Sequence, residues 1–346
     1  MNSSAPPVVD TSRPTMVDVA RRAGVSPKTV SNVVNGYAHV SEGTRERVVA
    51  AMAELNYRAN LSARNLKSGR TGVVALAVPW LSNPYFADLA GHVIRAAEAE
   101  SVTVLIDETR SEPERERRLL DGTGSHLLDG VIISPQALTA DDLAQLRGRE
   151  PMVLLGERIF DGGVDHVAAD NEAAAQELTE HLIATGRRRV ATIGFSGTRL
   201  TGTPQLRRAG VQHAVEQAGL AWDEQLHLAV EGFQRRDGAE AMRALLALPE
   251  RPDAVVCFND VVALGALKAL AEARVDVPGE IAVAGFDNIE GSDYAVPSLT
   301  TVDWDNAQLA EIAIELLLDR IHSRRPLRAR EIVVRHRVVS RESTGG

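Results

Sequence analysis

The 20-residue stretch Met16–Asn35 constrains this chain more than any other, because it predicts two short helices separated by a tight turn. Thr15 can cap the first helix, and Asp18 three positions later completes a capping box at the positive end of the helix dipole. Gly24 can end that helix, and Ser26 can cap the second one. The stretch therefore predicts a helix–turn–helix pair.

The second of these helices has two different faces. Val30, Val33 and Val34 share one face, and the polar side chains at i, i+3, i+4 and i+7 share the opposite one. A helix this short needs a neighbour to cover its apolar side, so the polar side is turned outward. Such a helix suits the major groove of DNA, although periodicity alone fits a helical hairpin with a solvated face equally well. The outward residues are Lys28, Ser31, Asn32 and Asn35.

The run VDVARRAGVSPKTVSNVVNGYAHVSEGTRERVVAAMAELNYRAN, residues 17–60, resembles the DNA-binding head of the LacI/GalR family of bacterial repressors almost position by position. A third helix near Ser41–Leu55 would complete a three-helix globule. The resemblance continues through Leu61–Thr71 and, more loosely, to about Ser340. It implies a ligand-responsive transcriptional repressor.

A protein that recognises a DNA sequence in this way needs hydrogen-bond donors and acceptors near the start of the second helix. Lys28 can donate to guanine O6 and N7, and Asn32 can bond adenine N6 and N7, although many family members have Arg where this chain has Asn32. The resemblance implies a hinge helix over residues 60–70, whose Ala63 and Leu66 would meet the minor groove; a plain linker is the alternative. The expected DNA-binding residues are Thr15, Ser26, Lys28, Thr29, Ser31, Asn32, Asn35, His39, Tyr57, Asn60, Ala63 and Leu66.

Charge is distributed unevenly along the 346 residues. The first 70 residues carry ten Lys and Arg against five Asp and Glu, whereas the rest carry 28 against 42, for a net charge of −9. A basic head on an acidic body fits a local DNA footprint. Cys257, the one cysteine, lies in an apolar run and is expected in the core. Residues 1–14 predict a disordered tail rather than a signal peptide, and no apolar run is long enough to span a membrane, so the expected location is the cytoplasm.

From residue 72 onward, apolar β-rich runs alternate with helical stretches, which predicts a parallel α/β fold of two sheets. A (β/α)8 barrel is the alternative, because eight βα units can be counted before a strand at Thr300–Trp304, a helix near Gln308–Ile321 and a strand at Glu331–Ser340. The eight runs are Gly72–Val78, Val102–Asp107, Gly130–Ser134, Met152–Gly156, Arg189–Gly194, Leu226–Val230, Ala254–Phe258 and Ile281–Phe286.

The resemblance implies a periplasmic-binding-protein-like body of two subdomains with the effector between them and crossovers near residues 171, 300 and 330. The predicted organisation is a tail (1–14), a helix-turn-helix DNA-binding domain (15–59), a hinge or linker (60–70), and an effector-binding and dimerisation domain (71–346).

In open parallel sheets, ligands bind beyond the carboxyl ends of the strands. Polar residues follow several predicted strands, although capping of the next helix explains Asp260 and Asn288 at least as well. The resemblance implies that Arg207 holds ligand hydroxyls and that Asp287 accepts hydrogen bonds from them. Paired donors and acceptors suit a polyol, so a sugar is expected ahead of a purine base. The expected effector-binding residues are Asn83, Tyr85, Phe86, Arg158, Arg207, Phe233, Asn259, Asp287 and Trp304, with Phe233 and Trp304 as aromatic faces.

The sequence contains no Walker loop, no nucleophile elbow and no metal-ligand spacing among its nine histidines, so it predicts no enzyme activity, cofactor or metal. The acidic run Glu112–Arg118 is expected to be a solvated helix start, and His181 and His213 are expected on helix surfaces. The predicted partners are a near-palindromic double-stranded operator, a small effector and a second copy of the chain, in a dimer or higher oligomer. A solute-binding protein and an α/β enzyme are the rival functions.

Overall fold

The computed structural model describes residues 14–34, 37, 39–57, 70–122, 127–146, 151–156, 163–195, 202–323 and 325–346. The chain divides into two compact units, Met1–Thr71 and Gly72–Gly346, which are called the head and the body below. No helix in the described ranges is long and apolar enough to cross a membrane.

The described part of the head folds into the predicted three-helix globule. The helices are α1 (Met16–Ala23), α2 (Pro27–Val34) and α3 (Glu42–Glu54). Their apolar faces meet in one small core, in which Val19, Val30 and Val48 have no exposed surface. Because α2 places Val30 and Val33 in this core, its polar face is left outside, as the periodicity predicted.

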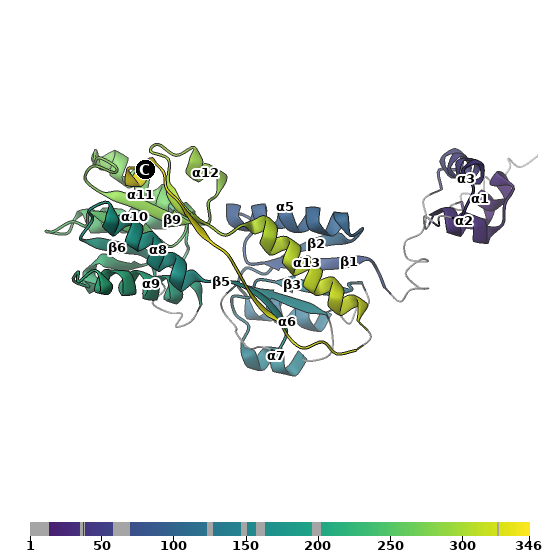
Figure 1. Cartoon of the computed structure of the whole chain (residues 1–346), viewed down its shortest axis with the longest axis horizontal. Coiled ribbons are helices and arrows are strands. Elements are labelled where there is room, and N and C mark those ends of the chain that lie inside the picture. Colours follow the sequence, from purple (N-terminus) through teal and green to yellow (C-terminus); the bar gives the residue numbers. More distant parts are fainter. Residues whose placement is uncertain are drawn as a thin grey trace, which may run out of the picture. The chain divides into compact units, whose positions relative to one another are not determined.

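The first half of the body is called the N-lobe. Its strands are β1 (Val73–Val78), β2 (Thr103–Glu108), β3 (Gly130–Ile133), β4 (Met152–Leu155), β5 (Asp165–Ala169) and β11 (Glu331–Val334), and its helices are α5 (Pro84–Ala99), α6 (Pro113–Gly122), α7 (Ala140–Leu146) and α13 (Asn306–His322). The sheet has the order β11-β5-β4-β3-β1-β2, and every pair in it is parallel. Helices α5 and α13 lie on one side of the sheet and α6 and α7 on the other (Figure 1), and each face packs an apolar cluster.

The second half is called the C-lobe and repeats this plan. Its strands are β6 (Val190–Phe195), β7 (His227–Ala229), β8 (Ala254–Cys257), β9 (Ala282–Phe286), β10 (Thr300–Asp303) and β12 (Arg337–Val339), and its helices are α8 (Asn171–Ala184), α9 (Thr203–Gln217), α10 (Arg235–Leu246), α11 (Asp260–Ala273) and α12 (Glu290–Asp293). The sheet has the order β12-β10-β9-β8-β6-β7, and only β12 is antiparallel to its neighbour. Cys257 is fully buried in its core, as expected.

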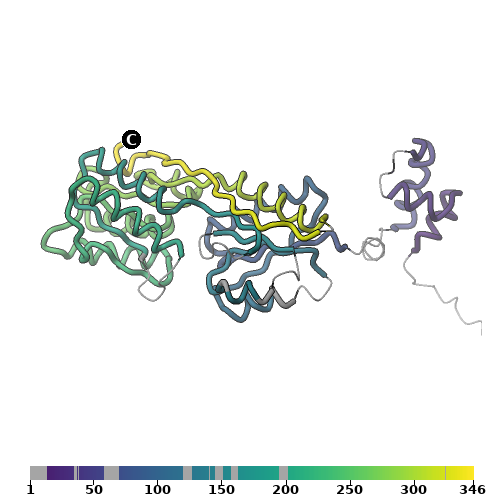
Figure 2. Tube along the Cα trace, turned by 60° about the horizontal axis from the view of Figure 1, so that its bottom comes forward, coloured from purple at the N-terminus to yellow at the C-terminus, as the bar shows by residue number. Residues whose placement is uncertain are grey.

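The chain passes between the two lobes three times: after β5, after β10, and between β11 and β12. Figure 2 shows the last pass as a yellow segment that runs along both lobes to the C-terminus. Two open sheets of six strands rule out the eight-stranded barrel. The predicted last strand, Glu331–Ser340, is in fact two strands, because the chain leaves the N-lobe sheet at Val334 and joins the C-lobe sheet at Arg337.

Two predictions about surface residues were wrong. Glu116 in α6 is completely buried, and its carboxylate accepts hydrogen bonds from the backbone N–H groups of Gln136, Ala137 and Leu138 at 2.7–2.9 Å. It therefore fixes the loop after β3 instead of facing solvent. His181 is half-buried, and its Nε2 lies 3.0 Å from Thr344 Oγ1 near the C-terminus.

Candidate DNA-reading surface and ligand pocket

The first head helix is capped at both ends by residues close in sequence: Thr15 and Asp18 at its start, and Gly24 at its end. Thr15 Oγ1 accepts a hydrogen bond from the N–H of Asp18, and the Asp18 carboxylate accepts one from the N–H of Thr15 at 2.9 Å. The Thr15 hydroxyl also donates to the Asp18 carboxylate at 2.6 Å, and this hydrogen bond, followed by the one from the Thr15 N–H, lowers the pKa of Asp18. At the other end Gly24 has φ +66°, which allows the chain to turn directly into α2. The turn that presents α2 is thus encoded locally.

The second head helix turns its polar residues outward. Ser26 Oγ accepts a hydrogen bond from the N–H of Thr29 at 3.1 Å, as expected of a capping residue. Lys28 is exposed, and Ser31 and Asn32 are half-buried beside the core valines. Lys28 therefore lies in the first turn of α2, and Asn32 lies one turn later on the same polar face, which is the kind of face that reads base edges in helix–turn–helix complexes.

The remaining predicted DNA contacts divide into three groups. His39 is exposed. Tyr57 is half-buried and packs against the head core, so it has a structural role of its own. The third group lies outside the described residues: Asn35, Asn60, Ala63 and Leu66.

A pocket of about 410 Å³ opens where the carboxyl ends of both sheets face one another, and it is called the interlobe pocket below. The register of the N-lobe sheet, with Val78 opposite Glu108 and Ala77 opposite Ile133, makes the loops after its strands leave at one edge. Arg158 lies outside the described residues. The other predicted effector residues all line the pocket: Asn83, Tyr85, Phe86, Arg207, Phe233, Asn259, Asp287 and Trp304.

Arg207 is the buried cation of the interlobe pocket. Its Nε donates to Asn171 Oδ1 at 2.6 Å, its Nη1 donates to the carbonyl of Phe258, and its Nη2 lies 3.7 Å from Asp287 Oδ1. The guanidinium stacks over the Phe286 ring, 4.2 Å from its centroid. It is therefore held rigid, and its charge is matched by one carboxylate.

Asp287 and Trp304 line the pocket beside Arg207. Trp304 Nε1 donates to Asp287 Oδ1 at 3.3 Å, which orients the carboxylate. The Trp304 ring packs nearly parallel to Phe286 and edge-on to His336, and only 2% of the residue is exposed. Much of the ring predicted to stack on a sugar is thus already covered by protein.

Two of the pocket residues also cap helices. Asn83 accepts a hydrogen bond from the N–H of Tyr85 at the start of α5, and Asn259 accepts one from the N–H of Val262 at the start of α11. Asn259 Nδ2 also reaches the carbonyl of Phe233, whose φ is +52°. In each case the helix cap uses one of the two lone pairs of the side-chain oxygen. Part of the hydrogen-bonding capacity of each side chain is therefore committed to the fold.

Asn171 and Ser111 are two of the polar pocket residues that sequence reasoning missed. Asn171, which orients Arg207, follows β5, a strand that was not predicted. Ser111 follows β2 with φ +57°, and its Oγ is buried without a hydrogen-bond partner among the described residues. Both residues follow a strand within three positions, so a search for polar residues after every strand, β5 included, would have found them. Such an orphan hydroxyl at a pocket wall suits a polar ligand atom.

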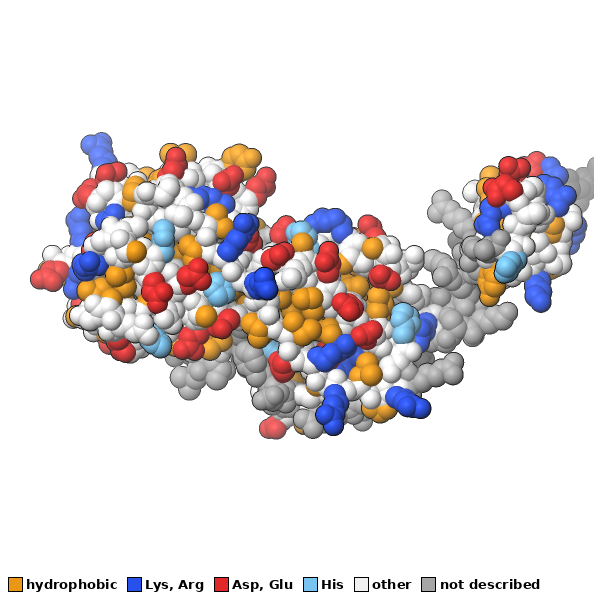
Figure 3. Space-filling model, in the orientation of Figure 1, with side chains coloured by type: hydrophobic (Ala, Val, Ile, Leu, Met, Phe, Trp, Pro, Cys, Tyr) orange, Lys and Arg blue, Asp and Glu red, His pale blue; other side chains and the backbone are white. Residues whose placement is uncertain are grey.

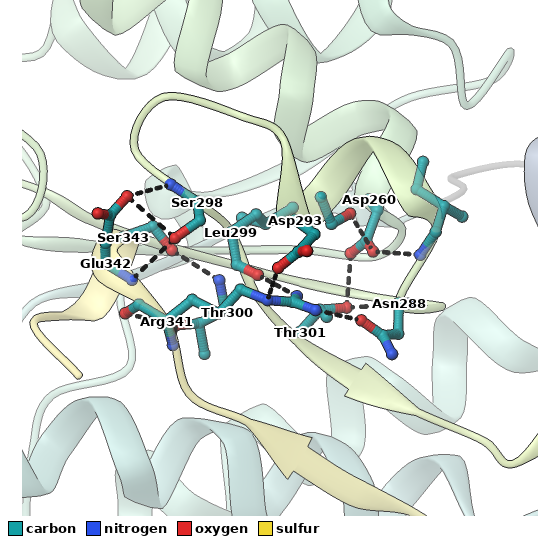
Figure 4. A network of polar contacts seen from close by, with 12 residues as sticks. Asp260, Asn288, Asp293, Ser298, Leu299, Thr300, Thr301, Arg341, Glu342 and Ser343 are labelled. Carbon is teal, nitrogen blue, oxygen red and sulfur yellow. Dashed lines mark hydrogen bonds and ion pairs between the residues drawn. The ribbon is translucent and has the colours of Figure 1, made fainter.

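Asp260 and Asn288 were expected to cap a helix or bind a ligand, but their side chains instead bond the segment around β9 and β10 and the C-terminal segment (Figure 4). The Asp260 carboxylate accepts hydrogen bonds from Ser292 Oγ at 2.6 Å, Thr301 Oγ1 at 2.7 Å and the N–H of Ile289 at 3.2 Å. Complete burial, reinforced by the Asp287 charge, raises the pKa of Asp260 to about 8. Asp260 therefore anchors the loop that follows β9.

Replacing Asp260 by asparagine is expected to flatten the pH dependence of stability. A carboxyl group with a raised pKa stabilises the fold fully below its unfolded value, near 3.8, and that contribution is lost as pH rises through about 8. We expect the native chain to lose stability relative to D260N between about pH 5 and pH 9. Urea unfolding across this range measures the difference, and parallel curves for the two proteins would contradict it.

Comparisons with known proteins agree with this geometry. Residues 15–60 match the family described as "Bacterial regulatory proteins, lacI family", and residues 179–344 match the "Periplasmic binding protein-like domain". The ribose operon repressor of Escherichia coli (strain K12) is 34% identical over 310 residues, which cover 89% of this chain and 93% of the repressor. A solved complex of the transcriptional regulator CelR with cellobiose is 31% identical, with 96% of this chain and 100% of that chain covered and a TM-score of 0.70. The lac repressor dimer bound to operator and the anti-inducer ONPF is 26% identical, with 96% and 99% covered and a TM-score of 0.81.

Proposed function

The chain belongs to the lacI family of bacterial regulatory proteins, and we propose that it represses carbon-source genes. In this proposal its affinity for the operator depends on whether a small polyol is bound in the interlobe pocket. The observation that carries this proposal is the convergence of Arg207, Asp287 and Asn171 at the strand ends of a body that follows a helix–turn–helix head. Because the proposed target is bacterial DNA, we also propose that the protein works in the cytoplasm. A homodimer on a near-palindromic operator follows from the likeness to the lac repressor dimer.

The head supplies the DNA-reading surface in this proposal. Figure 3 shows acidic and basic side chains intermixed over the visible face of the body, which is a poor match for a continuous phosphate backbone. The head has the basic balance and the outward α2 face. The other predicted contacts would bind the phosphates around them, and residues 60–70 would supply the hinge.

Alanine substitutions of Lys28 and Asn32 test base reading. If each side chain bonds a base edge, each substitution should cost about 1–3 kcal/mol on the cognate operator and relax preference at particular base pairs. Binding to a panel of operator variants at one salt concentration measures this. A substitution that weakens binding to every sequence equally would assign that residue to the phosphate backbone instead.

The pocket chemistry favours a polyol as effector. Arg207 donates, Asp287 and Asn171 accept, and Ser111 Oγ does both, which matches hydroxyl groups that give and take hydrogen bonds. The ribose operon repressor and the cellobiose complex among the similar proteins point to the same class. A purine base is the second candidate, since aromatic residues such as Trp80 and Phe233 line the same space.

A thermal-shift screen of D-ribose, cellobiose and purine bases tests the effector class. A ligand that binds only the folded body raises its melting temperature by mass action. A shift with a sugar supports the polyol, and a shift confined to a purine base selects the alternative. We also propose that the body has no catalytic activity, so any sugar that binds should be recovered chemically unchanged after incubation. Turnover would refute that part.

A further inference from the structure

The pocket carboxylate of Asp287 sits on a turn with two consecutive residues in the left-handed region of backbone space. Asp287 has φ +104° and Asn288 has φ +46°, and neither is glycine. Residues with a Cβ adopt such angles rarely, and although Asp and Asn tolerate them best, two in succession need support from surrounding contacts. The direction of the Asp287 side chain therefore depends on whatever holds this turn.

The inner side of the turn is held by the C-lobe sheet. The N–H of Asp287 donates to the carbonyl of Val302 at 2.9 Å, and the N–H of Asn288 donates to Thr301 Oγ1 at 3.2 Å. Thr301 Oγ1 in turn donates to the buried carboxylate of Asp260, which also receives the N–H of Ile289. These contacts hold the inner side of the turn, whereas the Asn288 side chain has a different partner.

That partner is Arg341, near the C-terminus (Figure 4). Its Nη2 donates to Asn288 Oδ1 at 2.7 Å, its Nη1 donates to the carbonyl of Leu299 at 2.8 Å, and its Nε lies 3.2 Å from Asp293 Oδ1. One guanidinium thus ties together the beginning, the middle and the end of the segment between β9 and β10. Arg341 itself is not among the described residues that line the pocket.

Arg341 is in turn fixed by its own segment. Its N–H donates to Thr300 Oγ1 at 2.8 Å, and Ser343 Oγ, two residues later, accepts from the N–H of Thr300 and donates to the carbonyl of Val283 at 2.6 Å. Ser343 is completely buried. The guanidinium is therefore mounted on the C-lobe sheet and can act as a rigid support.

We propose that Arg341 is a positioning residue for effector binding: by clamping Asn288, it holds the left-handed turn that directs the Asp287 carboxylate toward Arg207 and Trp304. The inference rests on the proposed function of the interlobe pocket. Without the clamp, the turn relaxes toward ordinary backbone angles and Asp287 moves away from Trp304 Nε1. A residue outside the pocket then sets the geometry inside it.

The indole N–H of Trp304 reports this geometry without any ligand, because it donates to Asp287. The chain has three tryptophans, Trp80, Trp222 and Trp304, so three indole resonances in a ¹⁵N-correlated NMR spectrum can be assigned by Trp→Phe substitutions. We expect Arg341→Ala to move the Trp304 resonance in the same direction as Asp287→Ala. The Trp222 resonance should stay, because that indole bonds Glu224 on another part of the C-lobe.

Glu342→Gln is the matched control, because the Glu342 carboxylate accepts hydrogen bonds from Ser298 and not from the turn at Asp287–Asn288 (Figure 4), so this variant should leave the Trp304 resonance in place. If Arg341→Ala does not fold, Arg341→Lys gives the answer: one ammonium cannot bond three separated acceptors, so an intermediate shift is expected. A Trp304 resonance at its native position in these Arg341 variants would overturn the proposal. Titrations of the native chain with cellobiose and D-ribose test the effector class separately. If neither sugar binds, the polyol proposal fails, but the Trp304 resonance still decides whether Arg341 positions Asp287.

Discussion

Replacement of Arg207 by methionine is expected to weaken effector binding by at least about 30-fold, or about 2 kcal/mol. The guanidinium is buried and bonds Asn171 and the Phe258 carbonyl, and it lies beside the Asp287 carboxylate. Methionine retains the packing on Phe286 but leaves these polar groups without their cation. Isothermal calorimetry with the sugar or base that gives the largest thermal shift measures the loss.

Arg208→Met is the matched control, because Arg208 is on the same helix but pairs with Glu224 and stacks over Trp222 away from the pocket. It should bind the effector normally. Both variants should bind operator DNA normally without effector, since the DNA-reading residues belong to the separate head unit. An unchanged affinity in Arg207→Met would move the effector site elsewhere.

A second large effect is expected at the buried carboxylate of Asp165, where Arg320→Ala removes two hydrogen bonds to a buried charge and should lower the free energy of unfolding by about 2–3 kcal/mol. The Asp165 side chain has no exposed surface, and Arg320 binds both of its oxygens at 2.7 Å. Arg330 binds the same carboxylate and cannot replace the missing geometry alone. Urea unfolding followed by tryptophan fluorescence measures the loss, because all three tryptophans lie in the body.

Arg337→Ala is the comparison variant. Arg337 also pairs with a carboxylate, that of Asp303, but its side chain is 74% exposed, so the cost should be below about 1 kcal/mol. Acid dependence gives a further check. Burial raises the pKa of Asp165, but hydrogen bonds from Arg320 and Arg330 lower it more, so its stabilisation is present above pH 3.8 and is lost as pH falls further. Equal losses in the two arginine variants would contradict this reasoning.

The parts of the fold that depend on neighbours in sequence could be predicted from sequence. The caps at Thr15 and Ser26 and the turn at Gly24 are local, so the head follows from its residues. The alternation of strands and helices in the body, and the polar residues after its strands, similarly identified pocket residues such as Asn83 and Asn259, whereas Arg207 came from the family resemblance.

The parts that depend on distant partners could not be predicted. The short strand β5 begins at Asp165, a charged residue that becomes acceptable in a core through Arg320 of α13 and Arg330, which directly precedes β11. The bend between β11 and β12, at Arg335 and His336, was not predicted within the run Glu331–Ser340, because it depends on which sheet each half joins. Glu116 was taken for a surface residue because its three backbone partners lie about 20 positions away. The clamp by Arg341 joins residues 53 positions apart, so it too appears only in the folded chain.

Effector-dependent operator binding is measured most directly by fluorescence anisotropy on one labelled operator fragment, at one salt concentration, with and without saturating effector. The fragment comes from selection of the sequences that the native chain prefers. If the chain is a ligand-responsive regulator, the effector should change operator affinity at least about fivefold in the native chain and not in Arg207→Met. A bound effector that leaves the operator affinity of the native chain unchanged would contradict the coupling between the interlobe pocket and the head.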